Sequence, residues 1–183
     1  VKTMSAGWNH SAAITESNHA WIWGKNALTK RRDGKLVFGS PLKPVDSPAP
    51  TIIQGLPRGL EITNISCGSH HTAILMEDGS VYATGITTDT AEPIGEEAVQ
   101  IVPPGLIDMP IRQFTSHFDR TTIVAGDSGQ QVLEVQLWST EELRESAIFE
   151  PEWVETLLSE DNNAGVHMVQ RGWLHTVVIA EKK

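Results

Sequence analysis

The chain has 183 residues, of which 39% are hydrophobic, and a formal net charge of −9. This length is enough for one domain with a sizeable core, and no run approaches the roughly 18 apolar residues of a membrane-spanning helix. The single cysteine, Cys67, excludes an internal disulfide and a cysteine zinc cluster. A lone cysteine is consistent with a reducing compartment, so we expect an intracellular protein, whether cytoplasmic, nuclear or mitochondrial.

The first predicted element, residues 4–24, has the pattern of a strand, a turn and a second strand. It aligns without a gap with residues 65–85, at an offset of 61 residues. The alignment superposes three pairs of residues that we expect to hold the same structural positions: Gly7 on Gly68, His10 on His71, and Gly24 on Gly85. The sequence therefore contains an internal repeat.

Residues 25–57 form an insertion after the first repeat. A short hairpin is predicted around Asp33 and Gly34, followed by extended coil over the proline-rich stretch Pro41 to Pro50. Between Lys25 and Pro50 six basic and two acidic residues give a net charge of +4, so the rest of the chain carries −13. An ordinary solvated loop explains this charge, and so does a contact with an acidic protein or with phosphates. For the second reading the candidate partner-binding residues are Lys30, Arg31, Arg32 and Lys35.

Residues 65–85 are the best-defined repeat. Short apolar runs flank Asp78 and Gly79, a pair that tolerates the positive φ angles of a two-residue type I′ turn. We therefore predict a β-hairpin with its turn at these two residues. Cys67 lies inside this repeat and is interpreted as a buried small residue, not as a nucleophile.

The second half of the chain continues the pattern in weaker form. An acidic insertion at residues 86–110 precedes a degenerate third repeat near residues 114–139. A capping-box pattern at Ser139 and amphipathic spacing predict one or two short helices within a third insertion, residues 140–165. A fourth repeat near residues 169–180 stops before its second strand, and its structural positions are Gly172 and His175.

Repeated hairpins at intervals of about fifty to sixty residues are typical of a β-propeller. The element G-x-x-H-[S/T], present at Gly7, Gly68 and Gly172, and the closing pattern aromatic-x-x-Gly resemble the repeats of the regulator of chromosome condensation family. That resemblance implies a seven-bladed propeller. We therefore expect an all-β chain that forms one domain, residues 1–183, with about three and a half repeats of a partial β-propeller and short helical insertions. Such a partial ring is expected to need further chain or a larger assembly to cover its two ends.

The residues give no pattern for catalysis, a cofactor or a metal ion, and we expect none of these sites. A histidine that recurs at one position of each repeat is expected to do a structural job, such as bonding a neighbouring backbone group. The tryptophans are expected to pack between blades, although Trp8 and Trp173, each next to a motif glycine, also fit positions that protrude at loop ends.

Three functions remain open, two of them through the resemblance. The first is a non-enzymatic scaffold that binds other proteins, as a subunit or regulator of a larger assembly. The resemblance also implies guanine-nucleotide exchange on a small GTPase, with the basic hairpin against the GTPase, or chromatin binding. Net charge −9 argues against nucleic acid as a partner, because neutralising phosphates drives that binding.

Overall fold

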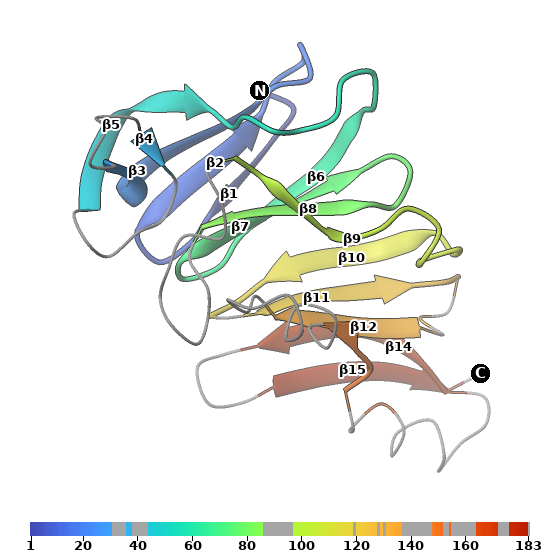
Figure 1. Cartoon of the computed structure of the whole chain (residues 1–183). Helices are drawn as coiled ribbons and strands as arrows, with labels where there is room; N and C mark the ends of the chain where they lie inside the picture. Colours follow the sequence, from blue (N-terminus) through green and yellow to red (C-terminus); the bar gives the residue numbers. More distant parts are fainter. Residues whose placement is uncertain are drawn as a thin grey trace.

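The computed structural model describes residues 1–30, 36–37, 44–85, 97–118, 120–127, 129, 131–136, 148–151, 154, 164–171 and 176–182. Four antiparallel β-sheets follow one another in chain order, as Figure 1 shows. The described residues contain no helix with the length and apolarity that crossing a bilayer requires.

The first sheet contains five strands: β1 (Thr3–Ala6), β2 (His10–Ile14), β3 (Ala20–Lys30), β4 (Leu36–Val37) and β5 (Pro44–Ile52). The two strands predicted for the first repeat are β2 and β3, which pair antiparallel. The predicted inserted hairpin is also confirmed, because the end of β3 pairs with β4. Its tip, residues 31–35, lies outside the described residues.

The prediction of coil over Pro41 to Pro50 is wrong from Pro44 onward. These residues begin β5, which pairs with β3 in a register that places Ile52 opposite Trp21. Among the described strands β5 pairs only with β3, so it lies at an edge of the sheet. Proline is tolerated there because the missing N–H costs no hydrogen bond on the open side.

The second sheet contains β6 (Ile62–Cys67), β7 (His71–Met76), β8 (Val81–Gly85) and β9 (Val99–Val102) in that order. The predicted hairpin is confirmed as β7 and β8. The sequence pattern did not predict β6 and β9, the strands on either side of this hairpin, as separate strands. The repeat is therefore a four-stranded sheet and not a hairpin alone.

The turn of that hairpin differs from the predicted type I′ turn. Only Gly79 has a positive φ angle, 80°, and Asp78 does not. Met76 N donates to Ser80 O at 2.9 Å, which leaves three residues in the loop, as in a type I turn followed by a left-handed glycine. The Asp78 carboxylate accepts from the backbone N of Ser80 at 3.0 Å, and this bond holds Asp78 in a right-handed conformation.

The third sheet has the order β10 (Ile111–Ser116), β11 (Arg120–Ala125), β12 (Gln131–Gln136) and β13 (Ile148–Phe149). The expected helix within residues 139–161 is wrong at β13, because Ile148 pairs with Val135 as a strand. Ile148 packs against the core beneath this sheet, so its apolar side chain is covered without a helix. Most other residues of this insertion lie outside the described residues.

The fourth sheet has two strands, β14 (Ala164–Arg171) and β15 (Thr176–Lys182). The predicted motif positions Gly172 and His175 fall between them, outside the described residues. Met168, Val177 and Ile179 on these strands are large apolar residues exposed to solvent.

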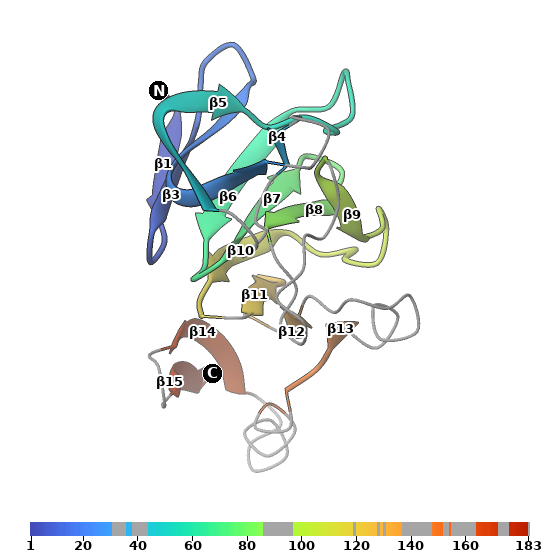
Figure 2. The same cartoon turned by 60° about the vertical axis from the view of Figure 1, so that its left-hand side comes forward.

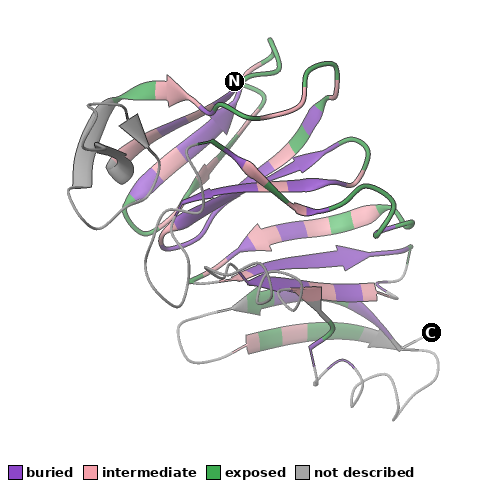
Figure 3. Ribbon diagram, viewed as in Figure 1, coloured by how far each residue is buried: buried purple, intermediate pink, exposed green. Residues whose placement is uncertain are grey.

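The cores lie between the sheets, and Figure 3 colours the buried residues of the strands purple. Strand β7 contributes side chains to the cores on both sides of its sheet, because successive side chains of a strand point to opposite faces. Ile74 and Met76 belong to the core shared with the first sheet, whereas Ala73 and Leu75 belong to the core shared with the third. Each middle sheet is therefore buried on both faces.

The first strands of successive sheets, β1, β6 and β10, contact one another in that order. Figure 2, turned by 60° from the first view, shows the sheets fanning outward from these strands. This is the arrangement expected of propeller blades around an axis. We call the boundary between the first and second sheets the first junction, and that between the second and third sheets the second junction.

Candidate functional site

The repeated motif lies in the loop between the first and second strands of each sheet. At the first junction, His10 Nε2 is 2.9 Å from Thr72 Oγ1, which belongs to the next sheet. At the second junction, His71 Nε2 is 3.1 Å from Thr121 Oγ1. Each motif histidine thus reaches the threonine that follows the histidine position of the next repeat. The partner is a side-chain hydroxyl and not the backbone group that we expected.

A second pair of hydrogen bonds follows the same rule. Cys67 N donates to Ser5 Oγ at 3.0 Å, and Ser116 N donates to Ser66 Oγ at 2.7 Å. Ser5 and Ser66 hold equivalent repeat positions, 61 residues apart. Both junctions are therefore joined by the same two types of contact.

The motif glycines stand where the backbones of neighbouring sheets touch. A Cβ added to Gly7 would lie 2.1 Å from Gly68 O, and a Cβ added to Gly68 would lie 2.5 Å from His117 O. Gly24 and Gly85 lie opposite His10 and His71 in their sheets. With a φ of 133°, Gly85 would place an added Cβ 2.3 Å from His70 O, so only glycine fits there.

Burial lowers the pKa of His10 to about 4 and that of His71 to about 3. The charges of neighbouring histidines lower both values further. The motif histidines are therefore neutral at physiological pH, which suits a fixed hydrogen bond. Burial also raises the pKa of the Cys67 thiol, so this cysteine has the environment of a packed residue and not of a nucleophile.

Replacing His71 by alanine should lower the free energy of unfolding by about 1–3 kcal/mol, because Thr121 loses its bond to the imidazole in a buried setting and keeps only its bond to Ser116 Oγ at 2.9 Å. Urea denaturation followed by fluorescence measures this change. His19→Ala is the control, since His19 is exposed in the turn before β3 and should change stability little. Partner binding should survive in the folded His71→Ala protein; an unchanged melt together with lost binding would contradict a structural role.

The third repeat carries a different pair at these positions. Arg120 replaces the histidine and Gln136 replaces the closing glycine, in register with each other. The guanidinium of Arg120 lies 3.0 Å from the carboxylate of Glu134, which is fully buried. Arg120 and Gln136 thus stand where histidine and glycine stand in the first two sheets, and the charge of Arg120 is paired with a carboxylate from β12.

Three aromatic side chains meet on the motif loops. Trp8 comes from the first loop, and its ring centroid lies 5.9 Å from that of His70 and 6.0 Å from that of Phe118. Trp8 is 56% exposed and Phe118 44% exposed. The protruding position considered for Trp8 is therefore the observed one. We call Trp8, His70 and Phe118 the aromatic cluster.

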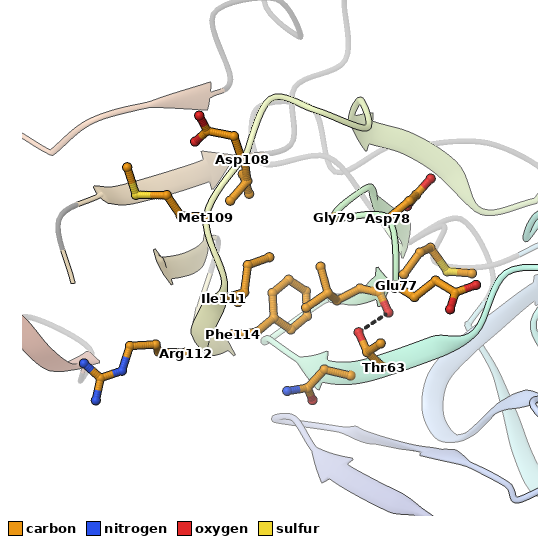
Figure 4. Close-up of a pocket in the computed structure, with 13 residues that line it drawn as sticks. Thr63, Glu77, Asp78, Gly79, Asp108, Met109, Ile111, Arg112 and Phe114 are labelled. Carbon is orange, nitrogen blue, oxygen red and sulfur yellow. Dashed lines mark hydrogen bonds between the residues drawn. The ribbon is translucent and has the colours of Figure 1, made fainter. Parts of the chain in front are cut away.

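A cleft of about 460 Å³ lies at the other end of the strands, at the second junction. Figure 4 shows the β7–β8 turn on one side of it and the segment before β10 on the other. Apolar side chains of Leu75, Ile107 and Phe114 line it, and Glu77, Asp78 and Asp108 are its acidic lining residues.

The predicted basic site cannot be assembled from the described residues. Lys30 ends β3, and Arg31, Arg32 and Lys35 lie outside the described part of the chain. No group of three or more metal-binding side chains occurs among the residues that the structure describes.

Sequence reasoning missed the aromatic cluster and the cleft. Trp8 and Phe118 hold the same motif position, directly after Gly7 and after His117, which takes the glycine position of the third repeat. The alignment therefore held a signal for two of the three rings, but it did not show that they meet at His70. The cleft arises between two sheets. The sequence did show that Gly79 is the repeat equivalent of Asn18. That difference indicates a cleft only once the contacts of the Asn18 side chain are known.

Comparison with known proteins gives matches in sequence and in fold. The family model described as the regulator of chromosome condensation repeat matches residues 1–28 and 62–88. The ultraviolet-B receptor UVR8 of Arabidopsis thaliana is 25% identical over 181 residues, which cover 98% of this chain and 39% of that protein. The guanine nucleotide exchange factor SRM1 of Saccharomyces cerevisiae is 33% identical over 91 residues, which cover 46% of this chain and 17% of that protein.

Among solved structures, human WBSCR16 superposes with a TM-score of 0.64 at 14% identity, over 97% of this chain and 44% of that one. The chain thus spans less than half of the length of each of these proteins. The two matched segments hold the motifs of the first and second sheets, and the predicted all-β partial propeller is confirmed. Two segments of the chain therefore match the regulator of chromosome condensation repeat, and the chain folds as successive blades of a β-propeller.

Proposed function

We propose that this chain is part of a non-enzymatic scaffold that binds another protein through the aromatic cluster. The observation that carries the proposal is the meeting of Trp8, His70 and Phe118, with two large rings about half exposed, on loops of three successive blades. Aromatic side chains that are rigid and partly exposed are enriched at protein interfaces. The blades hold the loops in place through the junction hydrogen bonds, so the cluster is preorganised for contact.

Two further observations support binding over catalysis. The titratable motif residues His10 and His71 are buried and bonded between blades, which removes them from solvent. The chain is similar in sequence to two proteins of different function, an ultraviolet-B receptor and a guanine nucleotide exchange factor. The repeat itself therefore does not specify a reaction.

The test is affinity capture with the wild-type chain and a Trp8→Ala, Phe118→Ala variant. A partner recovered with the wild type and lost with the variant supports the proposal. Met168→Ala is the control, because Met168 is exposed on β14, away from the motif loops of the first three blades. Equal recovery of every protein with all three chains would contradict it.

The basic hairpin remains a candidate second contact. Replacing Arg31 and Arg32 by glutamate should weaken binding to the captured partner by about tenfold at low salt and flatten its salt dependence, while folding stays unchanged. Binding is measured by calorimetry at two salt concentrations. Arg58→Glu is the control, because it reverses the charge of an exposed arginine outside the hairpin. Unaltered affinity at low salt would count against this contact.

The alternative is guanine-nucleotide exchange on a small GTPase. It is favoured by the similarity to the yeast exchange factor and by the hairpin of β3 and β4, which is inserted after the first repeat. GTPases loaded with a fluorescent nucleotide decide between the two functions. Accelerated nucleotide release in the presence of the chain supports exchange, and release at the intrinsic rate across the panel supports the scaffold.

A further inference from the structure

Two clefts at successive junctions are related by the repeat. The cleft at the first junction has a volume of about 400 Å³ and is lined by Asn18 and Leu60, among others. The cleft at the second junction, of about 460 Å³, is lined by their repeat equivalents Gly79 and Met109. The two clefts can therefore be compared position by position.

The side chain of Asn18 bridges the two blades at the first junction. Its side-chain Nδ2 donates to Leu60 O at 2.8 Å, and Ile62 N donates to its Oδ1 at 2.8 Å. A φ of 59° places Asn18 in the left-handed conformation that the end of the β2–β3 turn needs. One carboxamide thus serves as donor and acceptor to the backbone on which the next blade begins.

Gly79 leaves the second junction without this bridge. It occupies the position of Asn18 with a φ of 80°, but has no side chain to offer. The backbone groups equivalent to the partners of Asn18 are Met109 O and Ile111 N, and both residues line the cleft. By repeat equivalence, the cleft therefore has an acceptor and a donor at the positions that hold the Asn18 carboxamide at the first junction.

The other lining residues determine which residues could flank a carboxamide bound in this cleft. Leu75, Ile107 and Phe114 are buried apolar residues. Three carboxylates, Glu77, Asp78 and Asp108, line the same cleft, and the guanidinium of its one arginine, Arg112, donates to Asp127 O. This arrangement attracts cations and repels phosphates.

We propose that the cleft at the second junction binds a peptide segment of a partner protein, which inserts an asparagine or glutamine carboxamide between Met109 O and Ile111 N. Apolar neighbours of that residue pack on Leu75 and Phe114, and lysine or arginine residues face Glu77 and Asp108. The site goes beyond the function proposed above. It lies at the end of β7 opposite the aromatic cluster, so its test does not depend on that surface.

The probe is a fluorescent peptide with the sequence lysine-leucine-asparagine-leucine-lysine. Wild-type chain should bind it with one-to-one stoichiometry and shift the amide resonances of Gly79 and Ile111. Peptides with aspartate in place of asparagine, or glutamate in place of lysine, should bind at least about tenfold more weakly.

Two variants make the test specific. Gly79→Asn supplies the missing carboxamide from the chain itself; asparagine tolerates this φ, and a Cβ there meets only Ile107 O at 3.4 Å. This variant should lose at least about tenfold in peptide affinity, because the site is filled. Asn18→Gly should open the first junction and raise the stoichiometry to two peptides.

Gly79→Ala is the matched control, because it adds a Cβ at the same φ without a carboxamide, and it should keep its affinity for the peptide. Binding by Gly79→Asn equal to that of the wild type would overturn the proposal. Equal losses in Gly79→Asn and Gly79→Ala would also overturn it, as would a preference for the glutamate peptide. Loss of the aromatic cluster should leave all these results unchanged.

Discussion

Gly7→Ala should lower the free energy of unfolding by about 3 kcal/mol or more. The added Cβ would lie 2.1 Å from Gly68 O, a backbone atom of the next blade that cannot swing aside. Relief requires the first and second blades to separate, which stretches the Trp8 N to Gly68 O hydrogen bond of 3.2 Å and loosens the core between them. Urea denaturation of the purified chain measures the loss.

Gly59→Ala is the matched control for this prediction. Gly59 has a φ of 90°, and an added Cβ would meet no heavy atom within 4 Å. Its cost should be limited to backbone strain of about 1 kcal/mol. If Gly7→Ala is no more destabilising than Gly59→Ala, close contact of the blade backbones at this motif is not what requires glycine.

Acid should destabilise the fold through the two motif histidines. Burial holds their folded-state pKa values at about 4 and about 3, below the value of about 6.5 for an unfolded histidine. The unfolded chain therefore binds protons first as the pH falls, so the stability present at neutral pH is lost below about pH 6.5. At 1.36 kcal/mol per pH unit, each histidine should remove about 2 kcal/mol by pH 5.

Chemical denaturation at a series of pH values between 7 and 5 tests this expectation. A His10→Gln, His71→Gln variant should show a flatter dependence over the same range, because glutamine can bond the threonine hydroxyls but does not titrate there. Parallel pH curves for the two proteins would show that other groups cause the acid sensitivity.

The sequence predicted those parts of the fold that depend on local pattern. The hairpins at β2–β3 and β7–β8 follow from apolar runs with a turn between them, and the gapless offset between His10 and His71 showed that they repeat. The inserted hairpin was found in the same way. Local chemistry was sufficient because each of these pairs closes over a few residues.

The outer strands could not be predicted because their pairing is not local. Strand β5 contains three prolines and becomes a strand only where β3 offers an edge. Ile148 fits a helical pattern, yet the open side of β12 and the core beneath it turn this segment into β13. The type I′ prediction failed for a smaller reason, since the Asp78 side chain bonds Ser80 N.

The candidate site was less predictable than the fold. The recurrence of His10 and His71 indicated one role for each repeat, but the partner threonine lies in the next sheet, about fifty to sixty residues away. The aromatic cluster requires three loops to be brought together. The repeat spacing gives Trp8 and Phe118 the same motif position, but it does not show that their rings meet His70. The basic hairpin, which charge alone singled out, stays a prediction.

The histidine and serine contacts at the two junctions have the same polarity, because side chains of one blade bond groups of the blade that follows it in the chain. The histidine and serine of one blade reach the threonine and the backbone N–H of the next, and the same order recurs at the second junction. The leading and trailing faces of a blade are therefore complementary to each other and not to themselves. A second copy that docked on these faces would join head to tail, as in a ring or a filament, and a dimer with two-fold symmetry would have to use another surface.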